Sequence, residues 1–292
     1  MRIWADTKPE WVVAALQLPA RICSSESNRN GLEVWEVAGG DYYRLLYSDE
    51  TEFVVDRQGS RIWFCWRDCF PLHYVTPYLT GPILGFVLRL RGMISLHASS
   101  IVVGGGAIAL VGTNGTGKST TAAAFALRGL SILADDIVSL RIEEPAVVTH
   151  PGHPRICLWP ESVAGLFGSR EALPYITESW DKRFLDLRGP SLHFHGKPAP
   201  LKAIYFLGPR NPGPDVSIAA VEGSSAMLAL VENTYANYLL DSQLRAQEFK
   251  SLVRIVSLVP MRRVSPIEGM EHLPQICDAI LQDVDSLPAP RS

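Results

Sequence analysis

The stretch ALVGTNGTGKSTTAAAFALRG, residues 109–129, decides the fold that the sequence predicts. Within it, residues 112–119 fit the pattern G-x-x-x-x-G-K-[ST] at every fixed position. Glycines in such a loop let the backbone curl so that successive N–H groups point at phosphate oxygens. The lysine reaches the β- and γ-phosphates, and the serine hydroxyl is a ligand for Mg²⁺. The pattern therefore predicts a phosphate-binding loop.

The residues on either side of the loop supply the context that such a loop needs. The unbroken apolar run 107–111 predicts a strand that is buried on both faces. The alanine-rich segment 118–128 predicts a helix that ends at Gly129, and residues 131–138 predict another strand. A strand, a loop, a helix and a second strand in this order favour an α/β fold.

The chain before this segment has a different pattern. Residues 1–76 are predicted to form a small antiparallel β domain, because they contain short alternating segments rich in aromatic residues and separated by turn residues. The four segments are Glu33–Val37, Tyr42–Tyr47, Thr51–Val55 and Arg61–Trp66. Residues 77–292 are predicted to form the second domain, which opens with a helix over residues 77–91.

The rest of the second domain is predicted from simpler signals. Residues 151–200 are rich in Pro, Gly, His and Arg, which favours a long irregular region with one short helix near residues 161–167. Further strands are expected at Ile94–His97, Ser100–Val103 and Ala203–Leu207, and further helices at Ser225–Leu230 and Tyr235–Val256.

Composition excludes some classes of function. The 292 residues carry a net charge of only −3, which lacks the basic footprint of a nucleic-acid-binding protein. No apolar run approaches the roughly 18 residues that a membrane span needs. The five cysteines are scattered, and no apolar leader precedes them, so free thiols and a cytoplasmic location are expected. Cys65 and Cys69 lack a second pair at zinc-site spacing.

Two adjacent carboxylates end the strand that follows the predicted helix. One carboxylate at the position of Asp135 or Asp136 can hold Mg²⁺ in phosphoryl transfer, and the other can accept a proton from a hydroxyl nucleophile. Alternatively, one of them caps the next element or pairs with an arginine. His97 lies fifteen positions before Gly112, where a histidine taken alone is more often a hydrogen-bonded core residue than a catalyst.

Three segments taken together resemble the HPr kinase/phosphorylase family, bacterial serine kinases that act on a phosphocarrier protein. They are Leu96–Ser99, the loop Gly112–Ser119 and Leu133–Asp136, and the resemblance covers roughly residues 93–140. It implies a P-loop core related to phosphoenolpyruvate carboxykinase, with ATP or another nucleoside triphosphate and Mg²⁺ as cofactors. The implied nucleotide contacts are Gly112, Thr113, Asn114, Gly115, Thr116, Gly117, Lys118, Ser119 and Thr120.

The resemblance also implies roles for single residues. His97 and Lys118 become active-site residues, and Asp135 becomes the general base on the acceptor serine. Ser119 and Asp136 become partners of Mg²⁺. The two aspartates could exchange these roles, and the sequence leaves both assignments open.

The segment after the acidic pair departs from the family. Bifunctional members have a glycine-rich stretch with Glu-Ile-Arg-Gly, whereas residues 152–162 here keep Arg155 without its acidic neighbour. Phosphorolysis and the phosphocarrier substrate are therefore not carried over. The chain looks closer to a divergent branch that includes kinases of lasso-peptide precursors.

Further candidates come from the long irregular region. Lys182 and Arg183 are adjacent cations that could neutralise a transferring phosphoryl group, or they could be a solvated surface pair. His193 and His195 alternate as on a strand, but no acidic or cysteine partner that would complete a metal site stands nearby.

The sequence is compatible with two classes of function. The first is an ATP- and Mg²⁺-dependent kinase that phosphorylates a hydroxyl, with a serine of a protein or peptide favoured over a small molecule. The second is a nucleotide-binding regulator or scaffold that uses the aromatic N-terminal sheet as its partner surface. The resembling kinases are hexamers, so a homo-oligomer is a further expectation.

Overall fold

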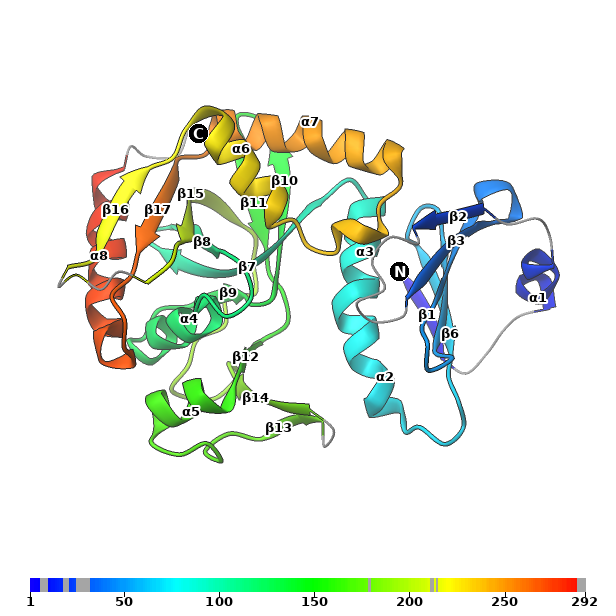
Figure 1. Cartoon of the computed structure of the whole chain (residues 1–292), viewed down its shortest axis with the longest axis horizontal. Helices are drawn as coiled ribbons and strands as arrows, with labels where there is room; N and C mark the ends of the chain where they lie inside the picture. The colour runs from blue at the N-terminus through cyan, green and yellow to red at the C-terminus, as the bar shows by residue number, and fades with distance from the viewer. Residues whose placement is uncertain are drawn as a thin grey trace. The chain divides into compact units, whose positions relative to one another are not determined.

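The computed structural model describes residues 1–5, 10–17, 32–177, 180–210, 213 and 215–287, and the backbone of residues 21–24. The chain is a mixed α/β protein (Figure 1). It divides into two compact units, of which one comprises residues 1–93 and 236–248 and the other comprises residues 94–235 and 249–292.

The first unit contains a six-stranded sheet of order β1-β6-β5-β4-β3-β2. Its neighbours are antiparallel except for β1, which runs parallel to β6. The strands are β1 Arg2–Ala5, β2 Arg21–Ser24, β3 Glu33–Val37, β4 Tyr42–Leu46, β5 Glu52–Asp56 and β6 Arg61–Cys65, and a helix, α1, spans Glu10–Leu16. The four predicted strands are therefore present, while β1, β2 and α1 were not expected.

A helical run follows this sheet and differs from the predicted single helix. It consists of α2 (Leu72–Tyr78), a π-helical turn η2 (Leu79–Ile83) that contains Pro82, and α3 (Leu84–Leu90). Its apolar residues join the core of the sheet, and the ring of Phe86 lies 5.1 Å from that of Tyr43. Residues 77–93 thus lie in the first unit rather than beyond a boundary at residue 76, because their apolar face packs on this sheet.

The second unit contains an eight-stranded sheet of order β11-β10-β7-β8-β15-β17-β16, with β9 paired to β7 beside this path. β8, β15 and β17 run parallel to one another, and the other pairs are antiparallel. The strands are β7 Ile94–Val103, β8 Gly106–Val111, β9 Ile132–Ala134, β10 Ile137–Glu143, β11 Ala146–His150, β15 Ala199–Leu207, β16 Ser217–Ala220 and β17 Met261–Ser265. The two short strands expected over residues 94–103 are one strand.

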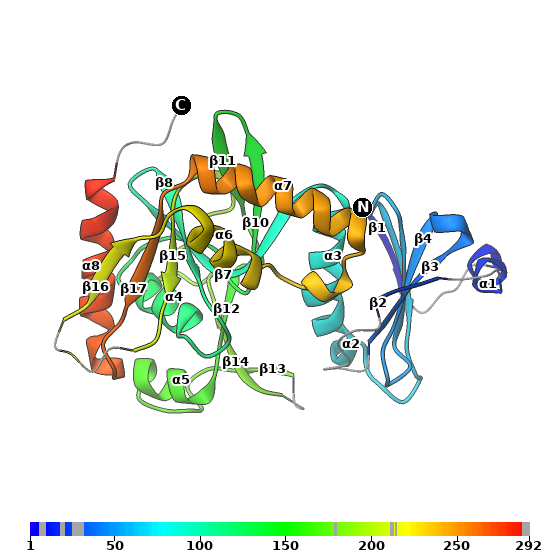
Figure 2. The same ribbon diagram turned by 45° about the horizontal axis from the view of Figure 1, so that its top comes forward.

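Helices cover both faces of this second sheet (Figures 1 and 2). Ile108 and Leu110 of β8 pack in one core with α4 (Lys118–Leu127) and α8 (Leu273–Ser286). Ala107, Ala109 and Val111 pack in the other core with α6 (Gly223–Glu232) and the end of α7 (Ser242–Leu258). The strand is therefore buried on both faces, as its unbroken apolar run predicts.

The region predicted to be irregular contains a third sheet, of order β12-β14-β13, next to a helix, α5 (Figure 2). The elements are β12 Arg155–Leu158, β13 Tyr175–Thr177, β14 Trp180–Asp186 and α5 Pro160–Phe167. The prediction of irregular structure was wrong, because Ile156 and Leu158 of β12 and Leu185 of β14 alternate into the core beneath α4. The helix near residues 161–167 is confirmed.

Two further expectations differ from the structure. The predicted helix from Tyr235 begins only at Ser242, after a 3₁₀ turn over Asn237–Leu239. The predicted strand over residues 131–138 is broken into β9 and β10 by Asp135 and Asp136.

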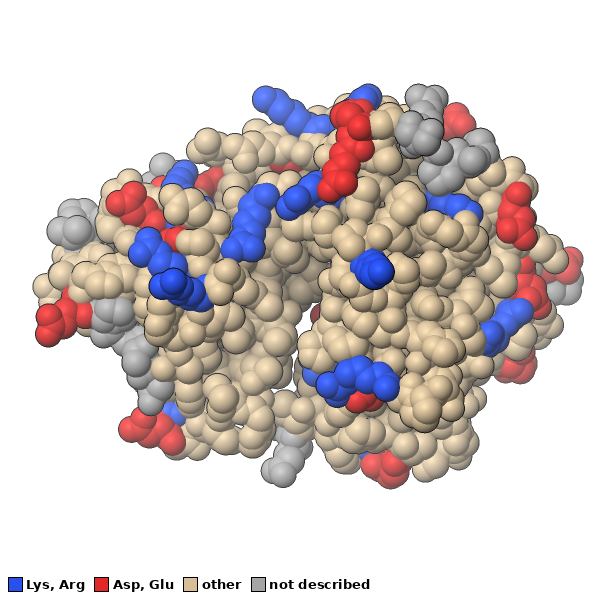
Figure 3. Space-filling model, turned by 180° about the vertical axis from the view of Figure 1, so that it is seen from behind, with Lys and Arg blue, Asp and Glu red and all other residues tan. Residues whose placement is uncertain are grey.

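The surface shown in Figure 3 carries Lys and Arg side chains interspersed with Asp and Glu side chains. Within the described residues, no helix combines the length and the apolar character that a bilayer span requires.

Candidate active site

The glycine-rich loop, residues 112–117, joins the end of β8 to the start of α4. Gly115 and Gly117 have φ angles of 83° and 96°, a left-handed conformation that glycine adopts without steric cost. A Cβ at Gly112 would lie 2.8 Å from the Thr116 hydroxyl and 3.1 Å from the Leu207 carbonyl oxygen at the end of β15. The loop therefore needs glycine for its curvature and for its close packing on β15.

Lys118 folds back over this loop. Its Nζ donates hydrogen bonds to the carbonyl oxygens of Gly112, at 2.7 Å, and of Thr113, at 3.0 Å. Burial lowers the pKa of Lys118 to about 8, although the carboxylates of Asp135 and Asp136 act in the opposite sense. The loop thus holds a buried cation whose only neighbours on the loop are carbonyl dipoles, an arrangement that favours the approach of an anion.

Asp135 is buried, and each of its carboxylate oxygens accepts a hydrogen bond. Its Oδ1 accepts from the Ser99 hydroxyl on β7 at 2.6 Å, and its Oδ2 accepts from the backbone N–H of Cys157 on β12 at 2.9 Å. Burial raises the pKa of Asp135, while hydrogen bonds from Ser99, Cys157 and Ser119 act to lower it. The involvement of Ser119 places this carboxylate beside the first turn of α4.

Ser99→Ala is expected to lower the free energy of unfolding by about 1–3 kcal/mol, because it leaves a buried carboxylate oxygen without its donor. Ser100→Ala is the matched control. That neighbouring hydroxyl is equally buried but has no hydrogen-bond partner among the described residues, so its loss should cost less than about 0.5 kcal/mol. Chemical denaturation measures both values, and equal losses for the two variants would contradict the role of Ser99.

Asp136 is more exposed than Asp135, although both line the same cavity. Its φ of 70° lies in the left-handed region that Asp tolerates better than most residues, and this turn breaks the predicted strand. Its side chain is 42% exposed and the residue is half-buried, whereas Asp135 is buried. The adjacent carboxylates therefore have different environments: Asp135 is buried and hydrogen-bonded through both oxygens, and the side chain of Asp136 is partly exposed.

His97 links the loop to Asp136. It lies opposite Ile137 in the β7–β10 pairing. Its Nε2 is 2.8 Å from Asn114 Oδ1, and its Nδ1 is 3.2 Å from the Asp136 carbonyl oxygen and 3.4 Å from Asp136 Oδ1. All three partner atoms are acceptors, so a neutral imidazole donates toward one side and an imidazolium toward both.

These groups line one cavity of about 290 Å³. Its lining includes residues 114–121 of the glycine-rich loop and α4, and also Asp135, Asp136 and His97. Gly112 and Thr113 do not line the cavity and contribute only their carbonyl oxygens to Lys118. The lining also includes the apolar residues Leu207, Pro266, Ile267, Met270, Leu273 and Ile276, together with the polar residues Glu161, Ser162, Lys182 and Arg210.

The structure separates the three remaining candidate cations. Lys182 lines the cavity, whereas Arg183 is buried on the opposite face of β14. Arg183 Nη2 donates to both carboxylate oxygens of Glu171, at 3.0 and 2.8 Å, and Arg183 Cζ lies 3.3 Å from the centre of the Tyr175 ring. Adjacent residues of a strand face opposite sides of the sheet. Lys182 and Arg183 therefore do not face the cavity together. Arg155 lies on β12 and does not line the cavity.

Several residues that line the cavity or support its carboxylates were not among the predicted site residues. Ser99 stands two positions after His97 and therefore on the same face of β7, a signal that was available. Arg210 follows the carboxyl end of β15, where binding residues gather in such sheets. Trp159, just before α5, and Ser162, in α5, could not be placed without the tertiary fold.

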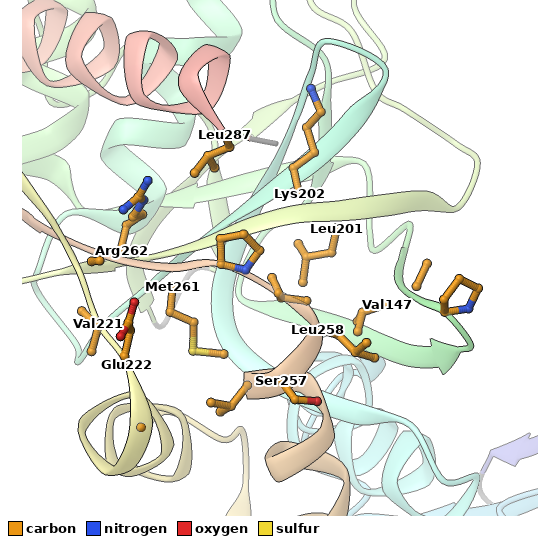
Figure 4. Close-up of a pocket in the computed structure, with 17 residues that line it drawn as sticks. Val147, Leu201, Lys202, Val221, Glu222, Ser257, Leu258, Met261, Arg262 and Leu287 are labelled. Atoms are coloured by element: carbon orange, nitrogen blue, oxygen red, sulfur yellow. The ribbon is translucent and has the colours of Figure 1, made fainter. Parts of the chain in front are cut away.

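Other clusters do not compete with this site. His193 and His195 exchange backbone hydrogen bonds with Ile132, and in the described part of the chain no group of three or more His, Cys, Asp or Glu side chains is placed to hold a metal alone. A larger cavity of about 590 Å³ lies at the other end of β15, where Leu201, Leu258 and Met261 surround it (Figure 4). Neither the glycine loop nor the paired carboxylates reach it.

Comparison with known proteins adds little to this geometry. No protein-family model matches the chain, and no curated protein matches it significantly. Among solved structures, it is similar to the HPr(Ser) kinase/phosphatase from Coxiella burnetii, with 13% identity and a TM-score of 0.36, over 66% of this chain and 90% of that chain. A similarity at this TM-score carries no argument about function, which therefore rests on the site itself.

Proposed function

We propose that the chain is a kinase that transfers the γ-phosphoryl group of ATP to a hydroxyl, in particular a serine of a protein or peptide. The observation that carries this proposal is that a glycine loop and two carboxylates of different exposure line one cavity. A glycine loop with its lysine faces two adjacent carboxylates, one buried beside Ser119 and the other exposed beside His97. A protein that only binds a nucleotide has no need of the second, exposed carboxylate.

The nucleotide phosphates fit the loop end of the cavity. The first turn of α4 offers unpaired N–H groups and the positive end of the helix dipole. Lys118 can exchange its two carbonyl partners for phosphate oxygens. The apolar residues of the lining, which include Leu207, Ile267 and Met270, suit a nucleoside base. This fit supports a core of the P-loop kinase type.

The pKa of Lys118 gives the proposed nucleotide binding a pH dependence. With a free-state pKa of about 8, the ammonium is mostly protonated at pH 7 and mostly neutral at pH 9. Only the ammonium attracts phosphates, so ATP affinity is expected to fall about tenfold between pH 7 and pH 9, with proton uptake on binding. Calorimetry in buffers of different ionisation enthalpy measures both quantities. Lys118→Met should abolish this dependence, and a wild-type affinity that stays flat from pH 7 to 9 contradicts it.

Ser119 and Asp135 are the residues that would hold Mg²⁺. Their donor set is oxygen only, as Mg²⁺ prefers, and Mg²⁺ commonly takes one or two protein ligands while phosphates and waters complete its shell. Burial of Asp135, which disfavours its charge, makes a neighbouring cation favourable. The bound ion would neutralise charge on the β- and γ-phosphates. The family resemblance implied that Asp135 is the general base and Asp136 the partner of Mg²⁺. The present assignment exchanges these two roles, as the sequence allows.

Asp136 is then the general base. Its exposed carboxylate accepts the proton of the acceptor hydroxyl, whose oxygen bonds to the γ-phosphorus as the bond to the bridging oxygen breaks. ADP leaves with that electron pair. His97 orients Asp136 from Nδ1 and is tied to the loop through Asn114, so the base and the nucleotide keep one geometry.

Transfer of labelled γ-phosphate tests the proposal. Wild-type protein with Mg²⁺, labelled ATP and peptides that carry a single serine is expected to form phosphoserine and an equal amount of ADP. Label that stays on tightly bound ATP, with no ADP formed, would support the nucleotide-binding regulator instead.

A further inference from the structure

Two tryptophans enclose the ammonium of Lys182 at the edge of the candidate active site. Its Nζ lies 5.2 Å from the ring centre of Trp159, just before α5, and 5.1 Å from that of Trp180, at the start of β14. The two residues are 48% and 39% exposed, although large aromatic side chains are usually buried. Neither indole is needed to fill the core, so their arrangement around one cation calls for another reason.

Lys182 is also close to the phosphate loop. It lines the same cavity as Lys118, and its positive charge contributes to the lowered pKa of Lys118. No carboxylate in the described part of the chain pairs with it. Like charges repel, and a lysine has a flexible four-carbon stem, so an unsupported Lys182 would turn toward solvent. The indole faces are the groups that oppose this movement.

The strand that carries Lys182 is anchored from its other face. Arg183 is buried against Tyr175 and paired with Glu171, which fixes β14 one residue away. The backbone of Lys182 is therefore set by the third sheet, and only its long side chain remains to be positioned. Trp159 and Trp180 lie close enough to the Lys182 ammonium to position this side chain.

We propose that Trp159 and Trp180 are positioning residues, whose indole faces hold the Lys182 ammonium where it meets the γ-phosphoryl group of the bound nucleotide. This inference rests on the proposed kinase function. Tryptophan is the strongest cation–π partner among the side chains. A cation held in place before the reaction stabilises charge on the transferring group without the entropy cost of ordering a lysine side chain. Neither tryptophan forms or breaks a bond.

The test is a double-mutant cycle read out by nucleotide affinity. Trp159→Leu and Trp180→Leu are each expected to weaken binding of a non-hydrolysable ATP analogue by about two- to thirtyfold, the range of a cation–π contact, and to change ADP affinity by less than about twofold. In a Lys182→Met background, the same substitutions should change analogue affinity by less than about twofold. Trp→Phe variants should recover most of the loss, because a ring face remains.

Controls separate this role from a structural one. Phe249→Leu removes another exposed aromatic residue of the same unit that does not line the cavity, and it should leave both affinities unchanged. Circular dichroism and a thermal melt identify any variant that fails to fold, and the Phe variants then carry the comparison.

Three results would overturn the inference while leaving the proposed function intact. The first is an equal loss of affinity for ADP and for the ATP analogue. The second is an undiminished effect of the tryptophan substitutions on analogue affinity in the Lys182→Met background. The third is no effect of these substitutions on analogue affinity in the wild-type background. Each can occur in an enzyme that still transfers phosphate, so each leaves the proposed function standing. A wild-type protein that binds both nucleotides but transfers no phosphate contradicts the kinase proposal, while the cycle still reports on the tryptophans. Binding of neither nucleotide overturns both.

Discussion

Asp136→Asn is expected to slow phosphoryl transfer by about 10²- to 10⁴-fold while ATP affinity stays within about threefold of wild type. The amide keeps the size of the carboxylate but cannot accept the proton of the acceptor hydroxyl. Because the side chain is exposed and its turn tolerates Asn, folding should be unaffected. Single-turnover transfer rates and calorimetric ATP affinities, measured on the same preparations, check both parts.

Asp135→Asn provides the matched comparison on the neighbouring residue. It removes the charge beside Ser119, so the dependence of ATP affinity on Mg²⁺ should weaken, unlike in Asp136→Asn. The two variants are therefore expected to affect different quantities: Asp136→Asn lowers the transfer rate, and Asp135→Asn weakens the Mg²⁺ dependence of ATP affinity. Normal transfer by Asp136→Asn together with normal Mg²⁺ dependence but no transfer in Asp135→Asn would return the base to Asp135.

Lys118→Met is expected to weaken ATP binding by at least about a hundredfold and to reduce transfer further, because the ammonium is the loop's only side-chain cation toward the phosphates. The free energy of unfolding should change by no more than about 1 kcal/mol. Two hydrogen bonds to carbonyl oxygens are lost, but so is the cost of burying a charge, which the lowered pKa of Lys118 reveals.

Lys202→Met is the control for Lys118→Met. Lys202 lies on β15 at the other cavity, so removal of its charge should leave ATP affinity and transfer unchanged. Calorimetry and denaturant unfolding compare the two variants. ATP affinity that survives Lys118→Met would show that the loop does not bind phosphates.

The part of the fold nearest to the glycine loop could be predicted because its signals are local. The apolar run of β8, the helix-forming residues of α4 and the left-handed Gly129 are each read from a few consecutive residues. The break at Asp136 could not be predicted, since Ile132–Ala134 and Ile137–Glu143 each have strand propensity and only a positive φ separates them.

The third sheet and the division into units depend on contacts distant in the sequence. Ile156 and Leu158 form a strand because they dock beneath α4, while the prolines and glycines around them favour irregular structure when considered alone. Leu239 and Leu240 join the first core although more than 140 residues separate them from Phe86. No local pattern carries such information.

The candidate site, like the fold, could be predicted only where its signals are local in the sequence. His97, Lys118 and the aspartates were found by motif, and their different environments emerged only with Ser99 and Cys157 in place. Lys182 and Arg183 had to be treated alike in the sequence, whereas β14 turns one toward the cavity and the other toward Glu171.

The most direct test of the central claim compares wild-type protein with Asp136→Asn under identical conditions. Each is incubated with Mg²⁺ and γ-labelled ATP, in the presence of a serine-containing peptide library and dephosphorylated cell proteins, and phosphoserine is counted by mass spectrometry. The kinase proposal predicts phosphoserine with wild-type protein and at least a hundredfold less with the variant, while both bind ATP equally. Phosphoserine at equal rates from the two proteins, or ATP bound by both with neither phosphoserine nor ADP formed, would contradict it.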